Sequence, residues 1–192
     1  MGMLILGLVL FLGVHSTRIV ADGWRTATIA KIGEKPWKGV YSLVSIAAFV
    51  LMLWGYGQAR QQAVMLWTPP AAMKHVAALL VLIAFIMFVA TYVPRNSIKA
   101  RLHHPMILSV KVWAVAHLLA NGSLADVLLF GGFLLWAVFS FRGARQRDRA
   151  AQTVYPAGTA SGTAIAVVAG AAAYAVFAFW LHGMLIGVRP FG

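Results

Sequence analysis

Residues 103–122 read HHPMILSVKVWAVAHLLANG, an apolar stretch that nevertheless carries Lys111 and His117. Its apolar part is about the length of a short membrane span, which needs roughly 17–25 residues. A span must be helical, because the hydrocarbon offers no water to an open backbone. Ionisable side chains inside a span are costly and face the interior of a helix bundle. We therefore expect this segment to be buried among other spans.

The rest of the chain is equally apolar. It has 192 residues, of which 61% are hydrophobic and 10% charged, whereas soluble domains carry about 25% charged residues. The expected fold class is all-α: an integral membrane helical bundle of about six transmembrane helices, forming a single domain over residues 1–192. The first segment lacks a basic start and an obvious cleavage site, which indicates a retained span. The expected spans are Gly2–Val20, Trp37–Tyr56, Met73–Val93, Pro105–Asn121, Leu124–Phe141 and Thr163–Gly187.

The basic residues predict how the bundle crosses the membrane. Lys and Arg number 16 against 4 Asp and Glu, for a net charge of +12. Most of them lie in three connecting segments, 18–38, 95–101 and 142–149, and only Arg60, Lys74 and Arg189 lie in the others. The positive-inside rule places both termini in the periplasm of a bacterial inner-membrane, multi-pass protein. Arg142–Gly162 is expected to be a flexible basic cytoplasmic loop beside membrane lipid. Charges confined to short loops argue against a nucleic-acid partner.

Two histidines are candidate metal ligands. His15 and His117 each lie several residues inside an apolar span, where a neutral imidazole still has a donor and an acceptor to satisfy. A neighbouring side chain or carbonyl could satisfy them, or a metal could, most simply a haem iron. The chain has no cysteine and four acidic residues, so haem b suits it better than zinc, calcium or magnesium.

The expected depths of the two histidines differ. With both helices upright they lie roughly 10 Å apart along the membrane normal. Helix tilt would remove the difference. Otherwise His104 or His182 would replace one partner.

The expected fourth span presents two polar faces. At about 100° per residue, Trp113 and Asn121 lie near the face of His117, whereas Lys111 shares another face with His104. We expect Trp113 to pack on a macrocycle and Lys111 to neutralise an anion, such as a haem propionate or Asp22. The alternative for Lys111 is an extended side chain that reaches the cytoplasmic interface. Ser16 or Asn121 is expected to orient a ligating imidazole or line the pocket.

Several blocks together resemble the NnrU family of bacterial membrane proteins, which are encoded with the denitrification machinery. They are HSTRI, YSLVS, HHPMILSVKVWAVAHLLANG, LLFGGFLLWA and LHGMLIGVRP. That family is similar in turn to the plant 15-cis-zeta-carotene isomerases, membrane enzymes that use haem b. The resemblance implies haem b held by His15, which precedes Ser16, and by His117, thirteen residues after His104. Ala114 stands where the plant enzymes carry a cysteine.

The leading functional interpretation is a haem-b-binding membrane protein that supports denitrification. It would handle nitric oxide or nitrite, pass electrons, or help to assemble a reductase. One alternative is a haem-dependent cis–trans isomerase of a carotenoid-like polyene, with Phe130, Phe133 and Trp136 lining a lipid-accessible cavity. Another is a membrane methyltransferase, although Asp148 stands alone among arginines where those enzymes carry an acidic pair. The fourth interpretation is a structural subunit without a cofactor. The sequence therefore does not decide whether the chain is an enzyme.

Overall fold

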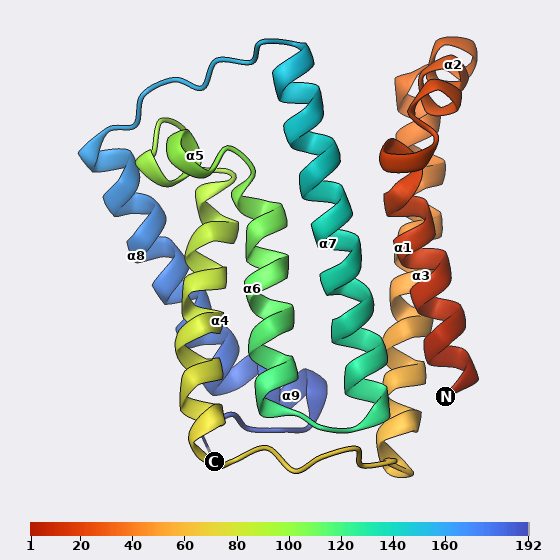
Figure 1. The fold of residues 1–192 in the computed structure, drawn as a ribbon, viewed down its shortest axis with the longest axis vertical. Helices are drawn as coiled ribbons and strands as arrows, with labels where there is room; N and C mark the ends of the chain where they lie inside the picture. The colour runs from red at the N-terminus through yellow and green to blue at the C-terminus, as the bar shows by residue number, and fades with distance from the viewer. Residues whose placement is uncertain (192) are drawn as a thin grey trace.

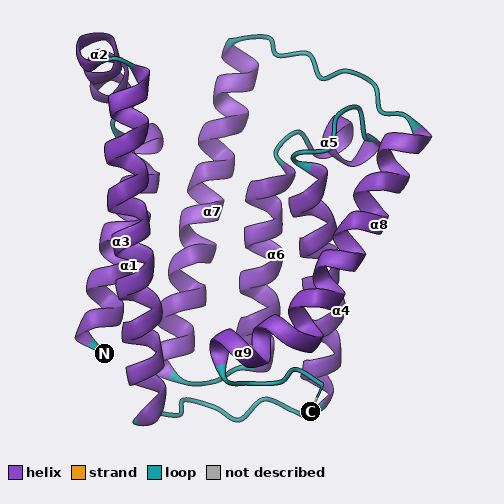
Figure 2. Ribbon diagram, turned by 180° about the vertical axis from the view of Figure 1, so that it is seen from behind, coloured by secondary structure: helices purple, strands orange, loops and turns teal. Residues whose placement is uncertain are grey.

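The computed structural model describes residues 1–191, which fold as an all-helical bundle (Figures 1 and 2). The elements in chain order are α1 (Gly2–Val20), α2 (Asp22–Ile32), α3 (Glu34–Gln61), α4 (Ala72–Ala90), α5 (Ser97–Leu102), α6 (Pro105–Ala120), α7 (Leu124–Ala150), α8 (Ala160–Val176), the π-helical turn η1 (Phe177–Leu181) and α9 (His182–Ile186). The expected fold class is confirmed.

The long helices alternate in direction along the chain. Helices α1, α4 and α7 run toward the end of the bundle that carries α2 and α5, and α3, α6 and α8 run back (Figure 1). Both termini therefore lie at the opposite end, away from the basic segments. Figure 1 shows α7 between the α1–α3 pair and the group of α4, α6 and α8.

Five segments of the described chain are long and apolar enough to cross a membrane: Gly2–Val20, Glu34–Gln61, Ala72–Ala90, Leu124–Ala150 and Ala160–Ile186. This finding makes the chain a membrane protein. The apolar helix Pro105–Ala120 is shorter, with 16 residues. It packs between α4 and α7, so the histidine-bearing segment lies inside the bundle, as the sequence predicts (Figure 1).

One predicted boundary is wrong. Phe141 is the predicted end of a span and Arg142–Gly162 the predicted loop, whereas α7 continues to Ala150. The residues 141–150 read FRGARQRDRA, which are mostly good helix formers. The helix ends only near Gln152, whose φ is +49°. The connecting segment is thus limited to residues 151–159.

Close contact between α1 and α3 sets the register of this pair. A Cβ atom on Gly7 would collide with the backbone of Met52, and one on Gly55 would collide with the backbone of Leu4. Small residues at such positions let helix backbones approach closely, which is the main source of packing energy inside a bilayer. Leu4, Met52 and Leu129 of α7 then share one buried cluster.

The direction of insertion is a testable prediction. We expect a reporter fused within the 62–71 connection to be active in the periplasm, and one fused after Ala150 to be active in the cytoplasm, because the basic segments stay inside. Paired alkaline phosphatase and green fluorescent protein fusions at both sites measure this. Phosphatase activity after Ala150 would contradict the predicted orientation.

Candidate functional site

His15 lies in the last turns of α1 and is held in a defined orientation. Its Nδ1 atom is 2.7 Å from the carbonyl oxygen of Phe11, one turn earlier. A carbonyl only accepts, so Nδ1 carries the proton and donates, which leaves Nε2 as a free acceptor. The ring stacks on Phe11 at 4.2 Å and lies 5.3 Å from Tyr41 and 6.2 Å from Trp136, between ring centroids. This imidazole is therefore prepared to bind through Nε2.

His117 lies in the last turn of α6 and has a different environment. Its ring centroid is 4.5 Å from that of Phe130, edge to face, and 5.2 Å from that of Trp113. Within residues 1–191, neither ring nitrogen of His117 has a hydrogen-bond partner. Trp113 thus lies beside His117 as the helix geometry predicts, and the imidazole itself is unanchored.

Aromatic side chains connect the two histidines across α7. Phe133 lies 5.7 Å from Phe11 and 5.5 Å from Trp113, between ring centroids. Because Phe11 touches His15 and Trp113 touches His117, these rings form a continuous path from one histidine to the other.

The two histidines lie at different depths. His117 contacts Phe130 and His15 contacts Trp136, six residues further along α7. That separation corresponds to about 9 Å along the helix axis. It agrees with the difference in depth expected from the sequence.

The side chains of Ser16 and Asn121 bond to backbone carbonyls in this structure. The Ser16 hydroxyl donates to the carbonyl of Leu12 at 2.7 Å, as helical serines commonly do. The Asn121 side-chain amide donates to the backbone carbonyl of His117 at 2.9 Å, so it closes the end of α6. The carbonyl of Phe11, which residue spacing alone does not single out, fixes His15 instead.

Lys111 lies over an aromatic ring. Its ammonium nitrogen is 4.2 Å from the centroid of Phe141, a cation–π contact between α6 and α7. Asp22, its other expected partner, pairs with Arg25 at 3.9 Å. The structure therefore gives Lys111 no carboxylate partner among the residues described.

His104 is engaged in a cluster at the basic end of the bundle. Its Nε2 atom is 2.7 Å from Asp148, which also accepts a 3.0 Å hydrogen bond from the Tyr155 hydroxyl. Burial and the neighbouring carboxylate raise the pKa of Tyr155, which keeps its hydroxyl protonated as a donor. His103 stacks on Tyr155 at 4.2 Å. The cluster fastens the 151–159 connection to α6 and α7, and sequence spacing did not reveal Asp148 as a partner of His104.

Two further histidines, His182 and His75, lie at the starts of α9 and α4. The Nδ1 atom of His182 donates to the carbonyl of Val188 at 2.6 Å, which is the same arrangement that His15 has, and His182 acts electrostatically on His117. His75 is exposed at the start of α4. Among residues 1–191, no group of three or more histidine or carboxylate side chains could hold a metal ion. Histidine pairs are thus the largest sets that these side chains offer.

The family model described as NnrU protein matches residues 3–190 of the chain. The chain belongs to the NnrU family. No curated protein and no solved structure matches it. At this level it is a denitrification-related membrane protein.

A buried carboxylate supports the His117 end of this NnrU protein. Asp126 accepts a 2.6 Å hydrogen bond from the Tyr56 hydroxyl and two more from the backbone and side chain of Ser123. The Ser123–Asp126 pair caps the start of α7, and Tyr56 ties it to α3. Phe130, one turn along α7, packs on both Tyr56 and His117. Tyr56 was not among the predicted site residues.

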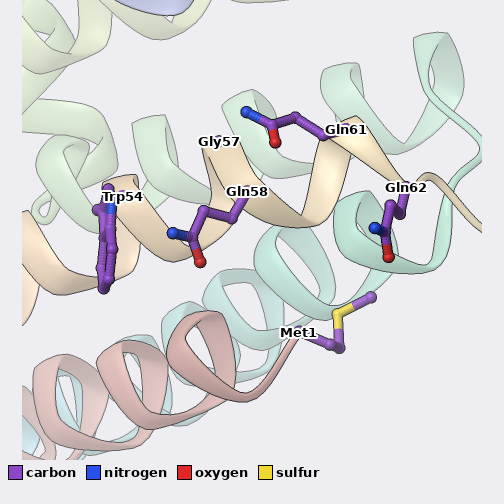
Figure 3. A pocket seen from close by; sticks show the side chains of 6 residues that line it. All are labelled: Met1, Trp54, Gly57, Gln58, Gln61 and Gln62. Atoms are coloured by element: carbon purple, nitrogen blue, oxygen red, sulfur yellow. The ribbon is translucent and has the colours of Figure 1, made fainter.

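A cavity lies elsewhere, at the end of α3. Figure 3 shows it at the last turns of α3, where Trp54, Gln58 and Gln62 lie on the side of the helix near Met1. Its lining holds no histidine and no charged side chain. It is therefore separate from the surroundings of His15 and His117.

The Tyr56–Asp126 hydrogen bond predicts a stability effect. Tyr56→Phe removes one donor from a buried carboxylate and should lower the free energy of unfolding by about 1.5–3 kcal/mol, the range for hydrogen bonds to charged groups. Unfolding of the purified protein in mixed micelles measures it. Tyr92→Phe, at a tyrosine that is 65% exposed, is the matched control. Equal stability of the two variants would contradict the prediction.

Proposed function

We propose that this NnrU protein binds haem b within the membrane through His15 and His117, and that it supports denitrification in this way. The observation that carries the proposal is the fixed imidazole of His15. Its Nδ1 donates to the Phe11 carbonyl, and its Nε2 is left free in aromatic surroundings. Metal-ligating histidines almost always have their second nitrogen held by such a hydrogen bond.

The donor set fits haem b. Two imidazoles lie in apolar segments, and the chain has no cysteine that could supply a thiolate. Phe11, Phe133 and Trp113 between them offer flat apolar surfaces of the kind that pack against a macrocycle. Since the rings now lie at different depths, ligation of one iron by both requires α1 and α6 to move along α7. Cofactor loading is thus expected to bring the two halves of the bundle into a new register.

Haem b would supply one-electron chemistry and binding of small ligands such as nitric oxide. Two residues of the chain would have different roles in holding the iron. The Phe11 carbonyl holds His15 in one orientation, so this ring is the permanent ligand. His117 has no such anchor, so its ring is free to turn away and leave a position for a ligand. The aromatic residues around it exclude water.

Phe130 and Trp136, which the sequence suggests as the lining of a polyene cavity, pack against other side chains. Phe130 lies 5.1 Å from Trp113, and Trp136 lies edge-on to His15.

The proposal predicts the absorption spectra of histidine variants. His15→Ala and His117→Ala should each abolish the haem spectrum or shift it, because each would remove a proposed iron ligand. Spectra of the purified oxidised and reduced proteins measure this. His75→Ala, at an exposed position outside the site, is the control and should keep the wild-type spectrum.

The two ligand variants are also expected to differ from each other. His117→Ala should retain haem on His15 and bind nitric oxide faster, whereas His15→Ala should lose haem. Size-exclusion profiles and circular dichroism establish that each variant is folded. Unchanged spectra in both folded variants would overturn the proposed ligand pair.

A further inference from the structure

Two buried polar atoms in the spans lack any partner. Within residues 1–191, Ser45 Oγ on α3 and Trp136 Nε1 on α7 are the buried side-chain nitrogen or oxygen atoms without a hydrogen bond. In the hydrocarbon no water can replace the missing partner, so each unpaired group costs several kcal/mol. The indole N–H can only donate, and the serine hydroxyl can donate as well. An acceptor from outside the chain would relieve both.

Ser45 lies on the face of α3 that packs against α1. Tyr41, Ser45 and Phe49 follow one another at intervals of four residues, which puts them on one side of the helix. Phe49 lies 5.8 Å from Phe11, and Tyr41 lies 5.3 Å from His15, between ring centroids. Ser45 is between these two contacts.

The register of α1 and α3 gives the depth of Ser45. The helices run antiparallel, with Gly7 against Met52. Eight residues onward from Gly7 is His15, and eight back from Met52 is position 44. Ser45 is therefore level with His15 to within one residue, which is about 1.5 Å.

Trp136 closes the same region from α7. Its ring centroid is 6.2 Å from that of His15, at an interplanar angle of 85°. Phe133, three residues earlier on α7, contacts Phe11. The two unpaired donors thus lie beside His15 on separate helices, at one level of the bundle.

The charges around this region favour a neutral ligand. Arg25 acts on Tyr41 from α2 and is paired with Asp22 at 3.9 Å, and Arg18 follows His15 by about one turn at the end of α1. A carboxylate or phosphate would find no free positive charge among the side chains that form the region. A neutral carbonyl oxygen suits the Trp136 N–H and the Ser45 hydroxyl, and a flat ring suits the aromatic surfaces.

We propose that Ser45, Trp136 and Tyr41 form a binding site for a lipid-soluble quinone between α1, α3 and α7. The quinone carbonyl oxygens accept hydrogen bonds from the Trp136 indole and the Ser45 hydroxyl, and its ring packs on the aromatic side chains beside His15. The tail extends into the surrounding lipid. This assignment rests on the unpaired donors and does not depend on haem binding, but it places an electron carrier next to the proposed iron ligand.

Photoaffinity labelling tests the site. The full-length protein in lipid nanodiscs is irradiated with an azido derivative of a short-chain quinone, and labelled peptides are identified by mass spectrometry. We expect label on the peptides that contain Tyr41 or Trp136, and competition by unlabelled quinone. The double variant S45A/W136F should bind about tenfold more weakly, the loss expected for two neutral hydrogen bonds.

Matched variants provide the controls. Ser42→Ala and Trp54→Phe change the same residue types at exposed positions of α3 and should leave labelling unchanged. The double variant should lose the thermal stabilisation that quinone gives to the wild-type protein.

Three results would overturn the proposal. One is equal labelling of S45A/W136F and wild type, and another is label scattered over the lipid-facing surfaces of all helices. The third is loss of haem in S45A/W136F, because the group that accepts hydrogen bonds from Ser45 and Trp136 would then be part of the haem and not a quinone. Haem content of His15→Ala, measured separately, keeps a failure of the haem proposal distinct from a failure of this one.

Discussion

The absence of water in the hydrocarbon is the constraint on which this structure depends. Every polar group inside the bundle must find its partner in the protein or in a bound molecule. Asp126 meets the requirement through Tyr56 and Ser123, and one nitrogen of His15 meets it through the Phe11 carbonyl. These satisfied groups also fasten helices together. The His117 imidazole and the Ser45 and Trp136 donors have no hydrogen-bond partner within the described residues. We therefore infer that they are the positions at which ligands bind.

The central position of α6 follows from the same constraint. With 16 residues it is shorter than the five spanning segments, and it carries Lys111 and His117. A short polar helix is tolerated where protein surrounds it, and α4 and α7 lie on either side of it (Figure 1). Lys111 then gains the face of Phe141 in place of a carboxylate. Burial of this segment in protein thus lowers the free-energy cost of placing an ionisable group at that depth.

Much of the fold follows from sequence, because hydropathy and helix periodicity are local properties. They predicted the helical class, the burial of the fourth segment and the position of Trp113 beside His117. Other features depend on contacts between distant residues. The His104–Asp148 pair joins positions 44 residues apart, and the Tyr56–Asp126 pair joins positions 70 apart, so neither appears in any local pattern. The side chains of Ser16 and Asn121 both bond to backbone carbonyls one turn away, which competes with a longer-range partner.

The asymmetry between the two histidines connects the proposals. His15, anchored by Phe11, lies at the level of the unpaired donors that we assign to a quinone. His117, without an anchor, lies about 9 Å further along α7 toward the end that carries the termini. Phe11, Phe133 and Trp113 link the two positions in van der Waals contact. On one iron, His15 would be the rigid ligand beside the electron carrier and His117 the displaceable ligand, so that one side chain would hold the cofactor while the other made room for a small ligand.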